Sequence, residues 1–133
     1  MVSPEVAPRV MPQSVEAEVA VLGSILLNPN EAIDYCIELL TPDHFYQRSH
    51  QIIFATILAM HAKSEPIDVV TLTTRLNDAG KLEQVGGVYY LSRISGSIPT
   101  AAHVKFYIEI LREKYRLRRL IEVATAAVKD AFE

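Results

Sequence analysis

The sequence predicts an all-α fold in which a compact head of about six helices is followed by a long C-terminal helix. Apolar residues recur at spacings of three and four along most of the chain, and no stretch alternates as a half-buried strand would. Capping residues and prolines divide the first hundred residues into short segments. With 133 residues, of which 50% are apolar and 22% charged, the chain can bury a core without covalent staples.

The N-terminal residues divide into an arm and a first helix. Residues 1–13 hold three prolines and no periodicity, so we expect a flexible arm, followed by the head at residues 14–98. Ser14 is a suitable N-cap for a helix from Val15 to Leu27. Gly23 costs helix stability, and we expect another helix to approach closely there. The predicted buried stripe of this helix is Val15, Val19, Leu22 and Leu26.

The second segment begins with a strong helix-start signal. Asn28 can cap the helix and Pro29 suits its first position. Thr41 and Pro42 repeat the pattern and predict a single short turn. The predicted inner face of the second helix is Ile33, Cys36, Ile37 and Leu40.

The rest of the head is predicted to contain three more helices. Ser49 to Ala62 is apolar on several sides, which predicts a helix at the centre of the head. Asp68 can cap the next helix, which Gly80 ends in a left-handed conformation. A short helix follows Gly86 and Gly87. The predicted inward residues of the helix after Asp68 are Val69, Leu72, Leu76 and Ala79, and the short helix is predicted to run through Val88, Leu91 and Ile94.

The long helix is predicted over residues 99–133, with Thr100 as its N-cap. Its first apolar stripe should pack on the head: Val104, Tyr107, Ile108, Leu111 and Tyr115. A second stripe at a shifted angle should project away from the head and favours assembly with another helix. It consists of Leu117, Ile121, Ala124, Val128 and Ala131. The candidate protein-interface residues are therefore Tyr107, Leu111, Tyr115, Leu117, Ile121, Ala124 and Val128.

Charge is unevenly distributed along the chain. Residues 1–100 carry 6 basic and 11 acidic residues, whereas residues 101–133 carry 7 basic and 5 acidic ones. Five basic residues lie in the run Arg112–Arg119, which we interpret as a solvated helix face or a dock for an acidic partner helix. The acidic head argues against DNA contact there. We expect the tyrosines at helical spacing to fill core edges or interfaces rather than stack on bases: Tyr89, Tyr90, Tyr107 and Tyr115.

The sequence contains no motif for catalysis, cofactor binding or metal binding. No G-x-x-x-x-G-K-[ST] loop occurs, so we expect no ATP hydrolysis by this chain. His44 and His50 flank a turn, but we do not expect them to hold a metal. Cys36 should be a buried, inert thiol. Because it is the single cysteine, no disulfide can form within the chain, which favours a reducing compartment. Without a signal peptide or a long apolar run, we expect a cytoplasmic protein that does not enter a membrane.

An ordered series of short motifs resembles the N-terminal domain of the bacterial DnaB-type replicative DNA helicase. The series spans residues 11–133, and its specificity lies in the order of the pieces. The motifs are PQSVEAE (12–18), VLGSILL (21–27), DHFY (43–46), HQIIF (50–54), PID (66–68), GKLE (80–83), VGGVYYL (85–91) and PTAA (99–102), with Leu76 and Tyr107.

This resemblance implies a non-catalytic collar domain that acts in DNA replication, in the primosome. In the family, the long helix is the first arm of a helical hairpin that pairs subunits. Homo-oligomerisation is thus implied, a dimer for this chain and a hexamer for its full-length parent. Primase is an expected partner and a helicase loader a possible one. DNA binding, ATP, Mg and the unwinding motor are implied only for the full-length parent. The second hairpin arm is expected to lie beyond residue 133.

Two other functions fit a small helical domain. One is a DNA-binding regulator of helix-turn-helix type, although the acidic head and the lack of a short basic recognition helix argue against it. The other is the helicase-binding domain of a primase, whose fold is similar in these families. The N-terminal position of residues 12–27 favours the helicase.

Overall fold

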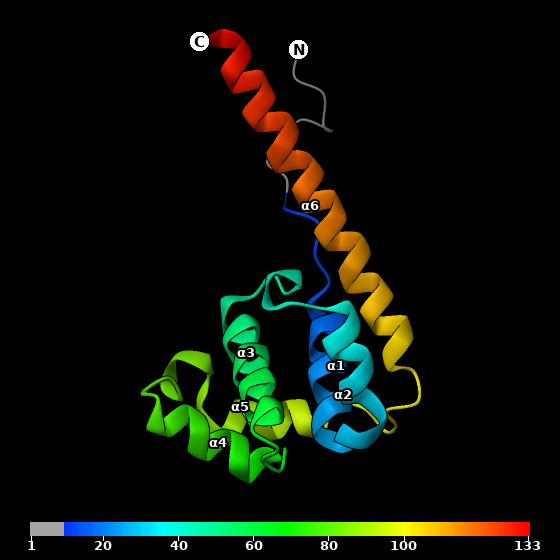
Figure 1. Ribbon diagram of the computed structural model, residues 1–133, viewed down its shortest axis with the longest axis vertical. Helices are drawn as coiled ribbons and strands as arrows, with labels where there is room; N and C mark the ends of the chain where they lie inside the picture. The colour runs from blue at the N-terminus through cyan, green and yellow to red at the C-terminus, as the bar shows by residue number, and fades with distance from the viewer. Residues whose placement is uncertain (1–9) are drawn as a thin grey trace.

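The fold is all-α, as predicted. A computed structural model describes residues 10–133, and within this range the regular structure consists of six α-helices and two 3₁₀ turns (Figure 1). Residues 1–9, most of the predicted arm, lie outside the described residues. The elements are α1 (Val15–Leu27), α2 (Pro29–Leu39), η2 (Pro42–His44), α3 (Arg48–Ala62), α4 (Val69–Asp78), η3 (Glu83–Val85), α5 (Gly87–Ser95) and α6 (Val104–Phe132).

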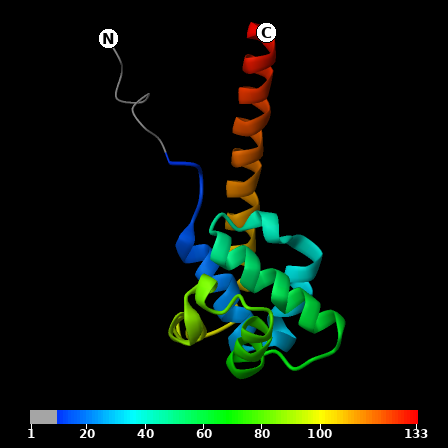
Figure 2. The same cartoon turned by 90° about the vertical axis from the view of Figure 1, so that its left-hand side faces the viewer.

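The helices form a head at one end and a single projecting rod. Helices α1 to α5 make up the head, and α6 packs along α1 and α2 before it continues beyond them (Figure 1). Seen from the side, the last turns of α6 rise clear of every other described helix (Figure 2). The head therefore contacts only the first part of α6.

The centre of the head is α1 rather than α3. Helix α3 is buried on several sides, as predicted, but α1 packs against α2, α3, α5 and α6. Nine of the 13 residues of α1 are buried, compared with six of the 15 residues of α3. Phe45 and Phe54 pack together beside them, with ring centroids 4.9 Å apart.

Gly23 has the role that the sequence predicted. A Cβ atom at this position would lie 2.7 Å from the carbonyl oxygen of Ile94 and 2.7 Å from Oγ of Ser97. Because α5 ends directly against α1 here, only glycine allows the two helices to approach so closely. Gly80, with φ of 70°, also has the predicted left-handed conformation after α4.

Several predicted inward residues face solvent instead. Each lies at the edge of an amphipathic stripe or near a helix end, where no neighbouring helix covers it. The exposed members are Val15, Ile37 and Ala79. The predicted start of the long helix was also wrong, because α6 begins only at Val104. Thr100 Oγ1 accepts a hydrogen bond from the Ala102 N–H at 3.1 Å, and this bond closes a local turn instead of capping the helix.

Candidate interaction surface

The first stripe of α6 packs on the head, as predicted. Val104, Ile108 and Leu111 are buried in the core, and the Arg112 guanidinium donates a 2.9 Å hydrogen bond to the Leu39 carbonyl at the end of α2. Leu111 is only 1% exposed. Its inclusion among the candidate interface residues is therefore wrong, because its side chain is already used by the core of this chain.

The two candidate tyrosines on α6 lie at the edge of the head. Tyr107 is half-buried against the core. The Tyr115 ring packs on His44, with ring centroids 4.5 Å apart. Both side chains are partly exposed, so they can border an interface but are already partly used by the head.

The second stripe projects into solvent. Ile121 is 41% exposed and Val128 is 58% exposed, Ala124 is exposed, and Leu117 is half-buried where α6 leaves the head. Ile121, Ala124 and Val128 thus lie on the surface among the described residues. The direction of this stripe was predicted; its role as an interface stays a prediction.

The exposed apolar face is longer than the sequence interpretation proposed. Leu120 is 58% exposed beside Ile121, and Phe106 and Ile110 lie on the same helical face nearer the head. Spacings of four and seven link Phe106, Ile110 and Leu117, so the signal was present in the sequence. We call this face the α6 stripe: Phe106, Ile110, Leu117, Leu120, Ile121, Ala124 and Val128.

Ion pairs within α6 neutralise part of its basic run. The Arg116 guanidinium binds both carboxylate oxygens of Glu113, at 2.7 and 3.1 Å, and this hydrogen bonding lowers the pKa of Glu113. Arg119 Nη1 donates to Glu122 at 2.6 Å. These pairs are exposed and lie one turn apart, as expected of a solvated helix face.

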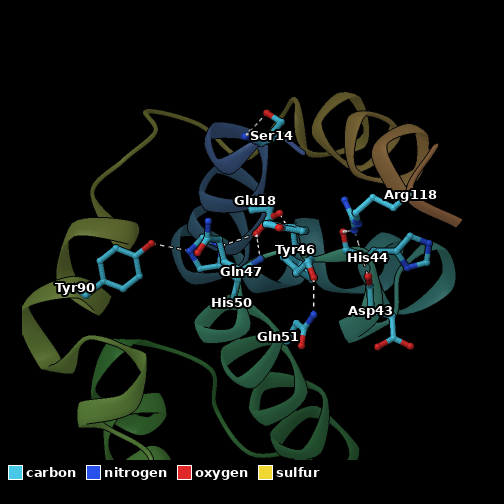
Figure 3. A network of polar contacts seen from close by, with 12 residues as sticks. Ser14, Glu18, Asp43, His44, Tyr46, Gln47, His50, Gln51, Tyr90 and Arg118 are labelled. Atoms are coloured by element: carbon cyan, nitrogen blue, oxygen red, sulfur yellow. Dashed lines mark hydrogen bonds and ion pairs between the residues drawn. The ribbon is translucent and has the colours of Figure 1, made fainter. Parts of the chain in front are cut away.

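Arg118 is the exception in this run. It is only 6% exposed, and its guanidinium donates to three backbone carbonyls: Pro12 at 2.8 Å, His44 at 3.2 Å and Asp43 at 3.4 Å (Figure 3). It also lies over the Tyr46 and Tyr115 rings. Arg118 thus joins the chain before α1, the η2 turn and α6 at the point where α6 leaves the head.

The position of Arg118 could have been found from the sequence. It continues the buried stripe Val104, Ile108, Leu111 and Tyr115 at the same spacing of four and three. The sequence interpretation assigned it to the charged run instead, because arginine is rarely buried.

A second polar network lies inside the head. Glu18 and His50 are buried, and Oε1 of Glu18 lies 2.7 Å from Nδ1 of His50. The same carboxylate accepts hydrogen bonds from the backbone N–H groups of Tyr46 and Gln47, while Nε2 of His50 lies 2.6 Å from the Tyr90 hydroxyl (Figure 3). The network thus joins α1, the segment before α3, α3 and α5.

His44, His50 and Cys36, which the sequence did not predict to be reactive, are held by contacts within the head. His50 belongs to the internal network, and Nδ1 of His44 accepts a 2.9 Å hydrogen bond from the Thr41 N–H. Cys36 is buried, and burial raises its pKa to about 12, so it is a poor nucleophile as predicted. Residues 10–133 contain no group of three metal-ligating side chains, and none of their helices is long and apolar enough to cross a membrane.

Comparison with known sequences points to one family. The family model described as the DnaB-like helicase N-terminal domain matches residues 10–113. The chain is 46% identical over 124 residues to a replicative DNA helicase of Bacillus subtilis (strain 168), and 45% identical over 124 residues to one of Geobacillus stearothermophilus. Each match covers 93% of this chain but 27% of the relative, so the chain spans about a quarter of their length.

Comparison with solved structures agrees. The crystal structure of the N-terminal domain of DnaB helicase from Mycobacterium tuberculosis superimposes with a TM-score of 0.89 at 38% identity, covering 92% of this chain and 85% of that one. A DnaB-like replicative helicase, solved in a study of its interactions with primase, matches with a TM-score of 0.76 at 30% identity. That match covers 88% of this chain and 27% of the helicase chain.

Proposed function

The chain belongs to the family of DnaB-like helicase N-terminal domains, and we propose that it oligomerises and docks partners for a replicative DNA helicase. The observation that carries the proposal is the α6 stripe. It presents seven apolar or small residues along a helix that extends beyond its own head. A contiguous apolar face of this kind is typical of an interaction site.

We propose that the α6 stripe is the assembly surface. In this chain it pairs two copies, and in the full-length helicase it contributes to a hexamer. A symmetric pair of long helices is the simplest closed arrangement of identical stripes. Tyr107 and Tyr115 then border the contact, while Leu117, Ile121, Ala124 and Val128 lie within it. The half-buried position of Leu117 supports a contact that begins where the head ends.

The activity of the parent protein is also a proposal. ATP and Mg would be used by a motor domain outside these 133 residues, and DNA would be bound mainly by that motor. This chain would contribute no catalytic group, since the buried Cys36 is a poor nucleophile and the Glu18–His50 pair is enclosed in the head. The function would place the parent at the replication fork, in the cytoplasm.

Primase is the partner we propose for the docking role, with a helicase loader as a further candidate. The support is the structural match to a helicase that interacts with primase. The test is calorimetry of primase binding to the full-length helicase hexamer, with and without residues 1–133. We expect the deletion to weaken primase binding by at least about tenfold, or about 1.4 kcal/mol. An unchanged affinity in a deletion variant that still forms hexamers would contradict the proposal.

A further inference from the structure

A groove lies on the α3 side of the head, and none of its lining residues belongs to α6. It has a volume of about 400 Å³ and runs between η2, α3 and the segment from α4 to Lys81. Helices α3 and α4 occupy this side in Figure 1, with α1 and α2 between them and α6. The groove is therefore separate from the α6 stripe. Its floor is the outer face of α3: Ile52, Ala55, Thr56, Ala59 and Met60.

Basic residues gather at this groove on an otherwise acidic head. Residues 1–100 contain only six basic residues, and four of them line it, compared with two of the eleven acidic residues. The lining thus carries a net charge of +2, whereas residues 1–100 together carry −5. The basic members are Arg48, Lys63, Arg75 and Lys81, and the acidic ones are Asp43 and Glu65.

Three of these four cations have no carboxylate partner. Arg75 is bound by Glu65, with Nε to Oε2 at 2.6 Å. By contrast, Arg48, Lys63 and Lys81 are exposed and form no ion pair with any of residues 10–133. Positive charge therefore remains at the rim of the groove for a ligand to neutralise.

The floor between these cations suits a protein segment. Ala55 and Ala59 are exposed one helical turn apart, and their small side chains let another backbone approach α3 closely. Ile52 and Met60 also line the groove but are buried in the core, so the apolar surface of α3 that a ligand can reach comes mainly from the two alanines. A groove with an apolar floor and a charged rim is the usual receptor for one face of an amphipathic helix.

We propose that this groove binds an acidic, amphipathic segment of a partner protein. Carboxylates of the segment would pair with Arg48, Lys63 and Lys81, and its apolar side chains would cover Ala55 and Ala59. The proposal rests on the docking function proposed above and supplies the chemistry of one docked partner.

A nucleic acid fits the groove less well than an acidic peptide does. No aromatic side chain lines the groove, whereas single-stranded nucleic acids are normally held by stacking on aromatic rings.

The experiment uses fluorescence anisotropy with a defined probe. The probe is a fluorescein-labelled synthetic peptide in which Glu-Glu and Leu-Leu pairs alternate, titrated with the 133-residue chain. An oligothymidylate of the same net charge serves as the nucleic-acid comparison. The groove variant is Lys63→Glu with Lys81→Glu. The matched control is Arg93→Glu with Lys129→Glu, which makes the same change in net charge at exposed positions outside the groove.

We expect the peptide to bind, and the groove variant to weaken it by at least about tenfold while the control changes it by less than about twofold. Circular dichroism melts verify that both variants are folded. Equal losses in the two variants, no peptide binding by the wild type, or tighter oligothymidylate binding that only the groove variant loses would each overturn the proposal. If the full-length helicase needs residues 1–133 for primase but the groove variant binds primase normally, the docking function stands and a primase-binding role for the groove fails.

Discussion

The two halves of α6 carry apolar residues at the same spacing but have opposite surroundings. In the half near the head, Val104, Ile108 and Leu111 are at most 1% exposed. In the projecting half, Ile121 and Val128 are 41% and 58% exposed. α1 and α2 pack on one face of the half near the head, whereas no other described helix lies beside the projecting half (Figure 2). Helical spacing therefore predicts a stripe, and only the fold decides whether the stripe is core or surface.

The comparison is sharpest for two leucines on the same helix. Leu111→Ala should lower the free energy of unfolding by about 2–5 kcal/mol, because it leaves a cavity in the core. Leu120→Ala removes the same atoms from a side chain that is 58% exposed and should change it by less than about 0.5 kcal/mol. Urea denaturation of both variants measures the difference. Similar losses would mean that the projecting half belongs to the core.

The boundary between the two halves should depend on Arg118. Arg118→Met keeps much of the side-chain length but leaves the carbonyls of Pro12, Asp43 and His44 without their charged donor. We expect a loss of about 2 kcal/mol. The control is Arg119→Met, at an exposed neighbour that pairs only with Glu122, with an expected change below about 0.5 kcal/mol. Urea denaturation of the two variants, compared with wild type, checks this contrast. Equal losses in the free energy of unfolding would show that Arg118 does not stabilise the contact between the head and α6.

His44 should give this boundary a modest pH dependence. Burial lowers the pKa of His44 in the folded state, and Arg112 and Arg118 act in the same direction. The unfolded chain therefore binds the proton more readily, so stability is full above the ordinary histidine pKa of about 6.5 and falls as the pH drops through it. His44→Phe should remove part of the fall in Tm between about pH 7.5 and about pH 5.

The control for this pH effect is His61→Phe, at an exposed position on α3. It should leave the pH dependence of Tm close to that of wild type. A His44→Phe variant whose Tm falls as steeply as wild type would show that another group is responsible.

Features of the fold that depend on residues close together in the sequence were mostly predicted correctly. The caps at Ser14, Asn28 and Asp68 all form, because each depends only on residues within one helical turn. The close approach at Gly23 was also predicted from the cost of glycine in a helix. The start of α6 was not, because Thr100 can cap a helix or close a turn with equal chemistry.

The long-range polar contacts could not be predicted from local patterns. Glu18 and His50 are 32 residues apart, and Arg118 lies 106 residues from Pro12, so no spacing rule links them. The groove beside α3 could not be predicted either, because its cations come from separate segments that only the fold brings together. The α6 stripe was partly predicted because it lies within one helix, but the predicted face was too narrow to include Phe106 and Leu120.

The projecting half of α6 is proposed to be a docking surface and not part of the core. The direct test is Leu117→Asp with Ile121→Asp, followed by sedimentation velocity across concentrations and by thermal melts. We expect the wild type to form a dimer of about micromolar or weaker affinity, since a few partly buried side chains must offset the entropy of association. The double variant should be monomeric, with the melting temperature of the head nearly unchanged. A variant that dimerises like wild type, or a head that melts much earlier, would contradict the account.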